Sequence, residues 1–269
     1  MMLTVENLSF SYKDKRVLTN VSLSVNEGEI VGLIGPNGSG KTTLIRNLAG
    51  NVTPQHGKII FMARDITHLD TSERAKIFSV VPQARNLPPA FTAWETVLLG
   101  RTPHLNWLGQ VSDMDTEIAC QAMKRTNTLD IAQRRIAELS GGEQQRLLLA
   151  RAITQQTPVI LMDEPTTHLD LKYQYNLLEE IRGIALADRK AIILVLHDLN
   201  LVSRYADKIA LLVDGRIKAF GSAEEVMQPG LLKSVYEVDL QVLNGGNSPV
   251  YILPPKKPRA DKGNKNVNH

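Results

Sequence analysis

A nine-residue segment reads Gly35-Pro36-Asn37-Gly38-Ser39-Gly40-Lys41-Thr42-Thr43. It matches the pattern G-x-x-x-x-G-K-[ST], a glycine-rich turn that wraps phosphate groups. An apolar run over 30–34 predicts a buried strand before it, and an amphipathic pattern over 42–49 predicts a helix after it. The alternative is an ordinary turn between a strand and a helix. Because every fixed position and both flanks are present, we interpret the segment as a phosphate-binding loop in an α/β fold.

The residue types in this loop suit a nucleoside triphosphate. Glycines let the backbone curl so that its N–H groups point at the phosphates, and the helix N-terminus adds partial positive charge. In this pattern Lys41 reaches the β- and γ-phosphates and the Thr42 hydroxyl binds Mg²⁺. The sequence therefore predicts ATP or a similar nucleotide, with Mg²⁺, as the ligand.

Composition limits the class of protein. The chain has 269 residues, of which 43% are hydrophobic and 22% charged, and its formal charge of +3 gives no argument for nucleic acid. One cysteine, Cys120, excludes an internal disulfide. Met1 leads straight into a strand-like pattern, so we expect no signal peptide. The apolar run over 191–196 is far shorter than the ~20 residues that span a bilayer.

The order of predicted elements indicates an α/β core with two additions. Alternating patterns over 3–10 and 17–25 predict an antiparallel subdomain with a turn at 13–15. Tyr12 lies on that turn, where its ring could stack on a base or simply cover the core. Helical patterns predominate over about 84–154, which predicts an inserted helical subdomain. We expect one ATPase domain over 1–253, followed by a basic, disordered tail over 254–269.

Polar residues follow three further predicted strands. Gln83 follows the strand over 79–81, Asp163 and Glu164 follow 158–162, and His197 follows 191–196. In an open parallel sheet, ligands bind beyond the carboxyl ends of the strands. Asp163 would hold Mg²⁺ with Thr42, and Glu164 would polarise the attacking water. We expect Gln83 to contact metal and water, and His197 to donate a hydrogen bond to the γ-phosphate.

A second anion-binding turn lies in the helical region, at Leu139-Ser140-Gly141-Gly142-Glu143-Gln144. A hydroxyl and two glycines at a helix N-terminus form an anion cradle. Together with the phosphate loop, with Asp-Glu-Pro-Thr at 163–166 and with the later histidine, this turn resembles the ATP-binding-cassette (ABC) ATPases. The resemblance extends from Leu3 to about Leu253, in the order of the motifs.

The resemblance implies a role for each matching residue. Tyr12 corresponds to the aromatic that stacks on adenine, and residues 35–43 to the loop around the phosphates. Ser140, Gly141, Gly142 and Gln144 correspond to the signature motif, and Asp170 to the aspartate of the loop that follows the metal-binding strand. In that family two cassettes pair head to tail. Each ATP then lies between Lys41 of one subunit and Ser140 and Gly142 of the other, and hydrolysis reopens the pair.

Three stretches resemble one subfamily: 100–105, 164–171 and 197–200. They are similar to the ATPase subunits of importers for iron–siderophores, haem and cobalamin. The resemblance implies two permease subunits, indirectly a substrate-binding protein, and a peripheral position on the cytoplasmic face of the membrane. The stretch over 101–105 could equally be a plain surface loop. We expect Leu87, Pro88, Pro89 and Phe91 to line a groove for a permease helix.

Two other classes remain as alternatives. A soluble ABC ATPase that is not coupled to transport, such as an iron–sulfur assembly ATPase, has a similar length. A kinase or GTPase could use the same phosphate loop, but neither needs the turn over 140–142, and no guanine-reading motif is evident. DNA-acting and ribosomal cassettes usually carry a coiled-coil insertion or a second cassette, and this chain has neither.

Overall fold

The computed structural model describes residues 1–83, 87–167, 169–243 and 250–254. Its centre is a six-stranded sheet in the order β10-β9-β3-β8-β7-β6, in which only β10 is antiparallel to its neighbour. The strands are β3 (Ile30–Ile34), β6 (Phe78–Val81), β7 (Val159–Asp163), β8 (Ala191–Val195), β9 (Lys208–Val213) and β10 (Arg216–Gly221). Every residue of β3, β7 and β8 is buried, as expected for strands covered on both faces.

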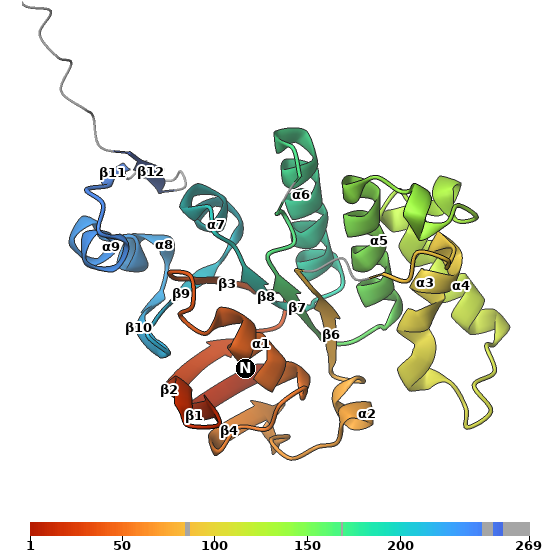
Figure 1. The fold of residues 1–269 in the computed structure, drawn as a ribbon, viewed down its shortest axis with the longest axis horizontal. Helices are drawn as coiled ribbons and strands as arrows, with labels where there is room; N and C mark the ends of the chain where they lie inside the picture. The colour runs from red at the N-terminus through yellow and green to blue at the C-terminus, as the bar shows by residue number, and fades with distance from the viewer. Residues whose placement is uncertain (84–86, 168, 244–249, 255–269) are drawn as a thin grey trace, which may run out of the picture.

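An antiparallel sheet packs below this central sheet, with helix α1 (Lys41–Ala49) between the two (Figure 1). Its order is β2-β1-β4-β5, built from β1 (Leu3–Tyr12), β2 (Lys15–Val25), β4 (His56–Phe61) and β5 (Arg64–Asp65). The short helix α2 (Thr71–Arg74) follows. Its fully buried Arg74 donates hydrogen bonds to Leu48 O and Asn47 O, and so caps the C-terminal end of α1.

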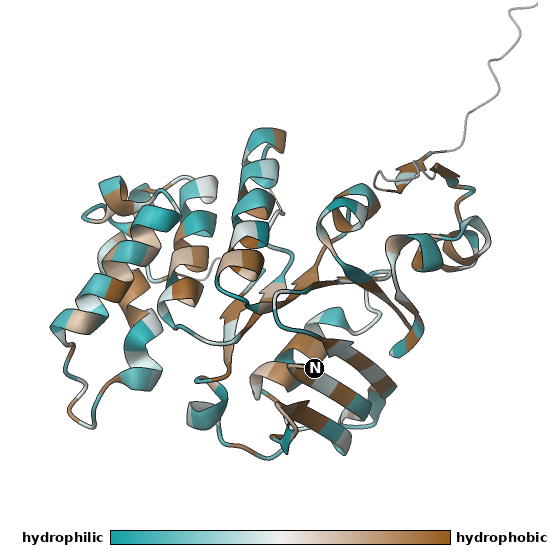
Figure 2. Cartoon of the chain, turned by 180° about the vertical axis from the view of Figure 1, so that it is seen from behind, coloured by the Kyte–Doolittle hydropathy of each residue, from teal (hydrophilic) through white to brown (hydrophobic). Residues whose placement is uncertain are grey.

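Two apolar cores lie on opposite faces of the central sheet. In β3 and β8, Ile30 and Ile192 pack into the core shared with α5 and α6, whereas Val31 and Ile193 pack toward α1 and the antiparallel sheet. Figure 2 shows the result from behind, with brown strands in the middle of the molecule and mixed colours on the surrounding helices. This alternation is the period of two that a strand requires.

The helical subdomain packs beside β6, at the right in Figure 1. It contains α3 (Ala93–Leu98), η1 (Leu99–His104), α4 (Asp113–Arg125), η2 (Leu129–Ile131), η3 (Ile136–Glu138) and α5 (Gly141–Thr154). Capping boxes begin its three α-helices, with Thr92, Ser112 and Ser140 as the N-cap residues. Each hydroxyl accepts from a backbone N–H that the helix itself cannot satisfy.

The remaining elements complete the far side of the sheet. They are α6 (Leu171–Ala187), α7 (Leu199–Tyr205), α8 (Ala223–Val226), α9 (Pro229–Tyr236), β11 (Gln241–Leu243) and β12 (Tyr251–Leu253). The last four lie at the opposite end of the molecule from α3–α5 (Figure 1). In the part of the chain that is described, no helix is long and apolar enough to cross a bilayer. Most of the predicted tail, from residue 255 onward, lies outside the described residues.

Candidate nucleotide site

The phosphate loop joins β3 to α1. At Gly35 the φ angle is 149°, and a Cβ atom there would lie 2.0 Å from Leu212 O, so no other residue fits. Gly38 and Gly40 also have positive φ, and Gly40 is the N-cap of α1. The first turn of α1 carries no acidic residue, so its free N–H groups leave a positive end for an anion.

Lys41 points back into this loop. Its Nζ donates hydrogen bonds to Gly35 O at 2.8 Å and to Pro36 O at 3.0 Å. Burial lowers the pKa of Lys41, while the nearby carboxylates of Glu164 and Asp163 raise it. Carbonyl oxygens are weaker partners than phosphate oxygens, so a triphosphate could take over this ammonium group.

Asp163 is the last residue of β7 and is 5% exposed. Burial raises the pKa of its carboxyl group, and a hydrogen bond from the Thr42 hydroxyl offsets part of this rise. Its Oδ1 is buried without a hydrogen-bond partner among the described residues. A buried carboxylate oxygen in need of a partner, next to a hydroxyl, suits a hard cation such as Mg²⁺. No cluster of three histidine, cysteine or acidic residues occurs in the described chain that would suit an all-protein metal site.

Three predicted residues meet at one point. The strand ends are level, because Leu33 pairs with Val195 and Asp163 also pairs with Val195. Beyond them His197 Nε2 lies 2.5 Å from Glu164 Oε1, and Gln83 Nε2 donates to Glu164 Oε2 at 2.5 Å. The Glu164 side chain is only 10% exposed. The structure therefore brings the three strand ends together around one carboxylate.

Glu164 also has an unusual backbone. Its φ is 52°, in the left-handed region that glutamate rarely adopts. Its N–H donates to Val195 O, so the peptide is fixed to the neighbouring strand. This conformation turns the Glu164 side chain away from Asp163, which is still in the strand, and toward His197. Strain of this kind is characteristic of functional sites.

Tyr12 is the last residue of β1, and its ring is exposed. Its side chain is 39% exposed and its ring packs edge-on against Phe10 with 4.7 Å between centroids. One face of the ring is thus available to a base, and the edge contact holds it in place. Stacking on adenine stays a prediction.

The signature turn forms a separate site. Ser140 caps α5, and its Oγ donates to Glu143 Oε2 at 2.7 Å, while Glu143 pairs with Arg134 at 3.1 Å. Gln144 supports the turn by donating to Leu139 O. The hollow around this turn is lined by Ser140, Gly141, Gly142, Glu143, Arg146, Leu169, Asp170 and Tyr173. The hollow at the phosphate loop is lined by Val17, Asn37, Gly38, Gly40, Lys41, Thr42, Thr43 and Glu164, so the two share no residue.

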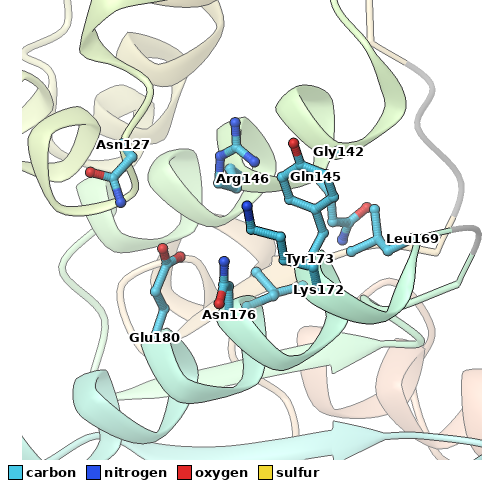
Figure 3. Close-up of a pocket in the computed structure, with 10 residues that line it drawn as sticks. Asn127, Gly142, Gln145, Arg146, Leu169, Lys172, Tyr173, Asn176 and Glu180 are labelled. Atoms are coloured by element: carbon cyan, nitrogen blue, oxygen red, sulfur yellow. The ribbon is translucent and has the colours of Figure 1, made fainter.

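Two side chains that the motifs did not mark support the signature turn. Figure 3 shows Arg146 of α5 and Tyr173 of α6 next to each other in the lining of a pocket that also includes Gly142 of the turn. The Arg146 guanidinium carbon lies 5.6 Å from the centre of the Tyr173 ring, and the ring also lies against Gly142. Asp170 caps α6 by accepting from Tyr173 N at 3.0 Å. Neither residue belongs to a motif, so the sequence did not identify them.

Two sequence interpretations need correction. Arg101 is 5% exposed and pairs with Asp115 at 2.7 Å, so the stretch over 101–105 is not a plain surface loop: most of it belongs to η1, and its buried Arg101 ties η1 to α4. Leu87 is buried in the core, so it does not line an open groove. Phe91 is 38% exposed, as the proposed groove requires.

Comparison with known proteins gives consistent matches. Residues 18–167 match the sequence profile of the ABC transporter family. An uncharacterized ABC transporter ATP-binding protein of Methanocaldococcus jannaschii is 42% identical over 94% of this chain and 98% of its own length. A Bacillus subtilis protein named as a probable siderophore transport system ATP-binding protein is 39% identical, covering 89% of this chain and 87% of its own.

Solved structures agree with the sequence matches. A chain of a transporter assigned to the metal-chelate ABC type, in an inward-facing conformation, superposes with a TM-score of 0.82 at 30% identity, covering 95% of this chain and 97% of the other. A dimeric bacterial ABC transporter cassette superposes with a TM-score of 0.74 at 30% identity, covering 82% and 99% of the two chains.

Proposed function

The chain belongs to the ABC transporter family of ATPases, and we propose that two copies of it drive an importer for an iron chelate. The observation that carries the proposal is the division of the site. The phosphate loop and the signature turn are both anion cradles, yet they form separate hollows within one chain. A second copy, turned head to tail, supplies each phosphate loop with a signature turn.

In the proposed dimer, the signature turn of one copy binds the nucleotide held by the other copy. Ser140 Oγ and the N–H groups of Gly141 and Gly142 stand at the start of a 14-residue helix, whose dipole favours an anion. In the proposed dimer they contact the γ-phosphate held by the partner's phosphate loop. A similar cassette that crystallised as a dimer supports this arrangement. ATP thereby joins the two copies, and loss of phosphate separates them.

Hydrolysis requires one water molecule and one base. In the proposed mechanism Glu164 accepts a proton from the water that attacks the γ-phosphorus, the bond to the β-phosphate oxygen breaks, and ADP and phosphate leave. Lys41 neutralises charge on the phosphates, and His197 donates a hydrogen bond to the γ-phosphate. Gln83 and His197 each contact one oxygen of Glu164 in this structure, which leaves a lone pair of the carboxylate for the attacking water, and His197 must turn from Glu164 to reach the γ-phosphate.

Asp163 and Thr42 are the residues that would hold Mg²⁺, with Gln83 as a further ligand. The unpartnered Asp163 Oδ1 and the adjacent Thr42 hydroxyl are oxygen donors of the kind that this ion prefers. The ion would neutralise negative charge on the triphosphate when bound. A single carboxylate with a few neutral oxygen donors matches the way Mg²⁺ is usually held beside phosphates.

The proposals for a permease partner and for the cargo rest on the named relatives and on one exposed residue, Phe91. Phe91 lies at the start of the helical subdomain with its ring exposed, where a short permease helix could dock. Such docking places the ATPase on the cytoplasmic face of the membrane, with a substrate-binding protein on the other side. Relatives named for siderophore and metal-chelate transport support an iron chelate as the cargo, with haem and cobalamin as the other candidates.

The experiment compares the wild type with E164Q, K41A and the exposed-surface control E117Q. We expect E164Q to bind ATP, to lose hydrolysis by about 100-fold or more, and to run as a dimer with ATP–Mg²⁺. K41A should lose nucleotide affinity, and E117Q should match the wild type. Rapid hydrolysis by E164Q would contradict the assignment of the base.

The transport step needs its own test. The ATPase is reconstituted with the permease encoded beside it, and uptake of labelled ferric siderophore, haem and cobalamin is measured. We expect ATP-dependent uptake of the ferric siderophore, lost in E164Q and in F91D. Preferred uptake of another cargo would overturn the iron-chelate assignment, and normal assembly of F91D with the permease would overturn the groove.

A further inference from the structure

The C-terminal hairpin is fastened to the helix that follows the catalytic histidine. Strands β11 and β12 pair antiparallel, with Val242 opposite Ile252. Ile252 N donates to Asn200 Oδ1 at 2.7 Å, and Asn200 Nδ2 donates to Ile252 O at 3.1 Å. A single side-chain amide thus bonds both backbone groups of one strand residue, as a neighbouring strand would.

Asn200 lies in the first turn of α7, three residues after His197. The Asp198 side chain caps this helix by accepting from Asn200 N at 2.8 Å and Leu201 N at 3.2 Å. The cap ties the backbone of this turn to the residue that follows His197, and the Asn200–Ile252 pair ties the side chain of Asn200 to β12. The first turn of α7 therefore has two attachments, one next to His197 and one to the C-terminal strand pair.

The segment over 250–252 is anchored in the core, whereas the side chains of β11 are exposed or half-buried. Val250 is 1% exposed and Ile252 is 6% exposed, and both belong to the same apolar cluster as Leu201 and Val202 of α7. Burial of such side chains favours the docked position of the strand pair. Movement of α7 away from β12 would expose this apolar surface and leave the Asn200 amide without partners.

We propose that Asn200 is a positioning residue for ATP hydrolysis: its two hydrogen bonds to Ile252 fix the start of α7 and thereby the place of His197 beside Glu164. The inference rests on the proposed function, because it assigns His197 and Glu164 to hydrolysis. Asn200 itself contacts neither nucleotide nor water in this account. It acts through the short segment that connects it to His197.

Loss of this contact should affect turnover more than binding. The phosphate loop follows β3. Thr42 lies in the first turn of α1 and Asp163 is the last residue of β7, and Asn200 holds none of these groups. Hydrolysis, in contrast, depends on alignment, and a displacement of about 1 Å of a reacting group can cost up to about 100-fold. We therefore expect kcat to fall while the KM for ATP stays nearly constant.

The test measures steady-state ATPase kinetics of the full chain with N200A and the matched control S203A. Ser203 lies on the same helix, is 8% exposed, and its hydroxyl has no hydrogen-bond partner in the described chain. We expect N200A to lower kcat by about tenfold with KM within about twofold. S203A should retain both parameters. Rates are expressed per ATP-binding site, so that any unfolded fraction does not count as lost turnover.

A second variant reaches the same contact from the other partner. I252P removes the backbone N–H of residue 252, which donates to Asn200 Oδ1, and keeps the carbonyl oxygen, which accepts from Asn200 Nδ2. We expect I252P to lower kcat as N200A does, and the double variant to be no slower than the slower single variant. Additive losses in the double variant would overturn the shared contact.

The outcomes separate this inference from the proposed function. If the wild type hydrolyses ATP, E164Q does not, and N200A keeps the wild-type kcat, the positioning role is wrong and the proposed function stands. If N200A loses kcat and S203A loses as much, the effect belongs to helix packing in general and the inference is again wrong. If E164Q hydrolyses ATP normally, the proposed function itself fails.

Discussion

The imidazole Nε2 of His197 lies 2.5 Å from Glu164 Oε1, although the two residues follow different strands, β8 and β7. Gln83, which follows β6, occupies the other oxygen of the same carboxylate. Both oxygens of the proposed base therefore have a donor, and the carboxylate keeps a lone pair for the attacking water. In the proposed mechanism the γ-phosphate becomes the acceptor for His197, so the imidazole turns away from Glu164 when ATP binds.

The backbone of Glu164 predicts a difference between two substitutions that both remove the carboxylate. At φ 52° an L-residue is strained, whereas glycine is not. We expect E164G to be more stable than E164A by about 1 kcal/mol, the reverse of their order at an ordinary helical position. Urea unfolding of the nucleotide-free proteins measures the difference. Equal stability would show that the left-handed conformation relaxes at no cost.

We expect the buried carboxylate of Asp163 to lower the stability of the nucleotide-free protein and to be required for Mg²⁺ binding. Its raised pKa means that the charged form is disfavoured in the folded state, so ionisation costs stability as pH rises through the raised pKa. D163N removes this cost, and we expect a higher Tm for the nucleotide-free protein. The same variant should lose the additional stabilisation that Mg²⁺ gives with ATP. Differential scanning fluorimetry with ATP, with and without Mg²⁺, tests both effects.

The Arg101–Asp115 pair predicts a structural effect far from the nucleotide. Arg101 also donates to Thr154 O, so it joins η1 and α4 to the end of α5. R101M should destabilise the protein by about 3 kcal/mol, because it leaves Asp115 beside an uncharged neighbour in a buried place. Chemical denaturation measures this loss. An unchanged midpoint would mean that the link is dispensable.

The same pair predicts a dependence on pH in acid. Hydrogen bonds from Ser112, and then Arg101, lower the pKa of Asp115 from its usual 3.8 to about 2. A depressed pKa contributes stability that is present above pH 3.8 and is lost as pH falls through about 2. We expect D115N to reduce this acid-sensitive part of the unfolding free energy. Unfolding curves at several pH values between 2 and 5 measure how the unfolding free energy depends on pH in the two proteins.

Much of the site could be predicted because its residues follow short apolar strands. The short apolar runs over 30–34 and 191–196 predict buried strands of a parallel sheet, whose polar ends then lie at one edge. The contact of Gln83 and His197 with the same carboxylate was not predictable, because it depends on the left-handed turn at Glu164. No propensity places a glutamate there.

Other elements differ from prediction for local reasons. The pattern over 71–77 predicts a short helix, but α2 ends at Arg74, whose buried side chain caps α1. Helix α9 was not predicted; in the structure proline occupies its first position, where the missing N–H costs nothing. The pattern over 238–243 predicts a strand, but pairing with β12 starts only at Gln241.

The role of Asn200 shows what sequence patterns leave out. The stretch over 197–200 resembles a subfamily, but the pattern does not say what its last residue contacts. Its partner, Ile252, lies 52 residues later in the chain. Only the fold brings the two together, and the pairing uses the backbone of Ile252, which any residue except proline could provide in full.

The central claim is that the serine–glycine turn of one copy completes the phosphate site of another. A crystal structure of E164Q with ATP and Mg²⁺ tests it most directly. We predict a two-fold dimer in which Ser140 Oγ of each copy lies within hydrogen-bonding distance of the γ-phosphate bound by the partner's Lys41. A structure in which Ser140 is remote from every γ-phosphate would contradict the account.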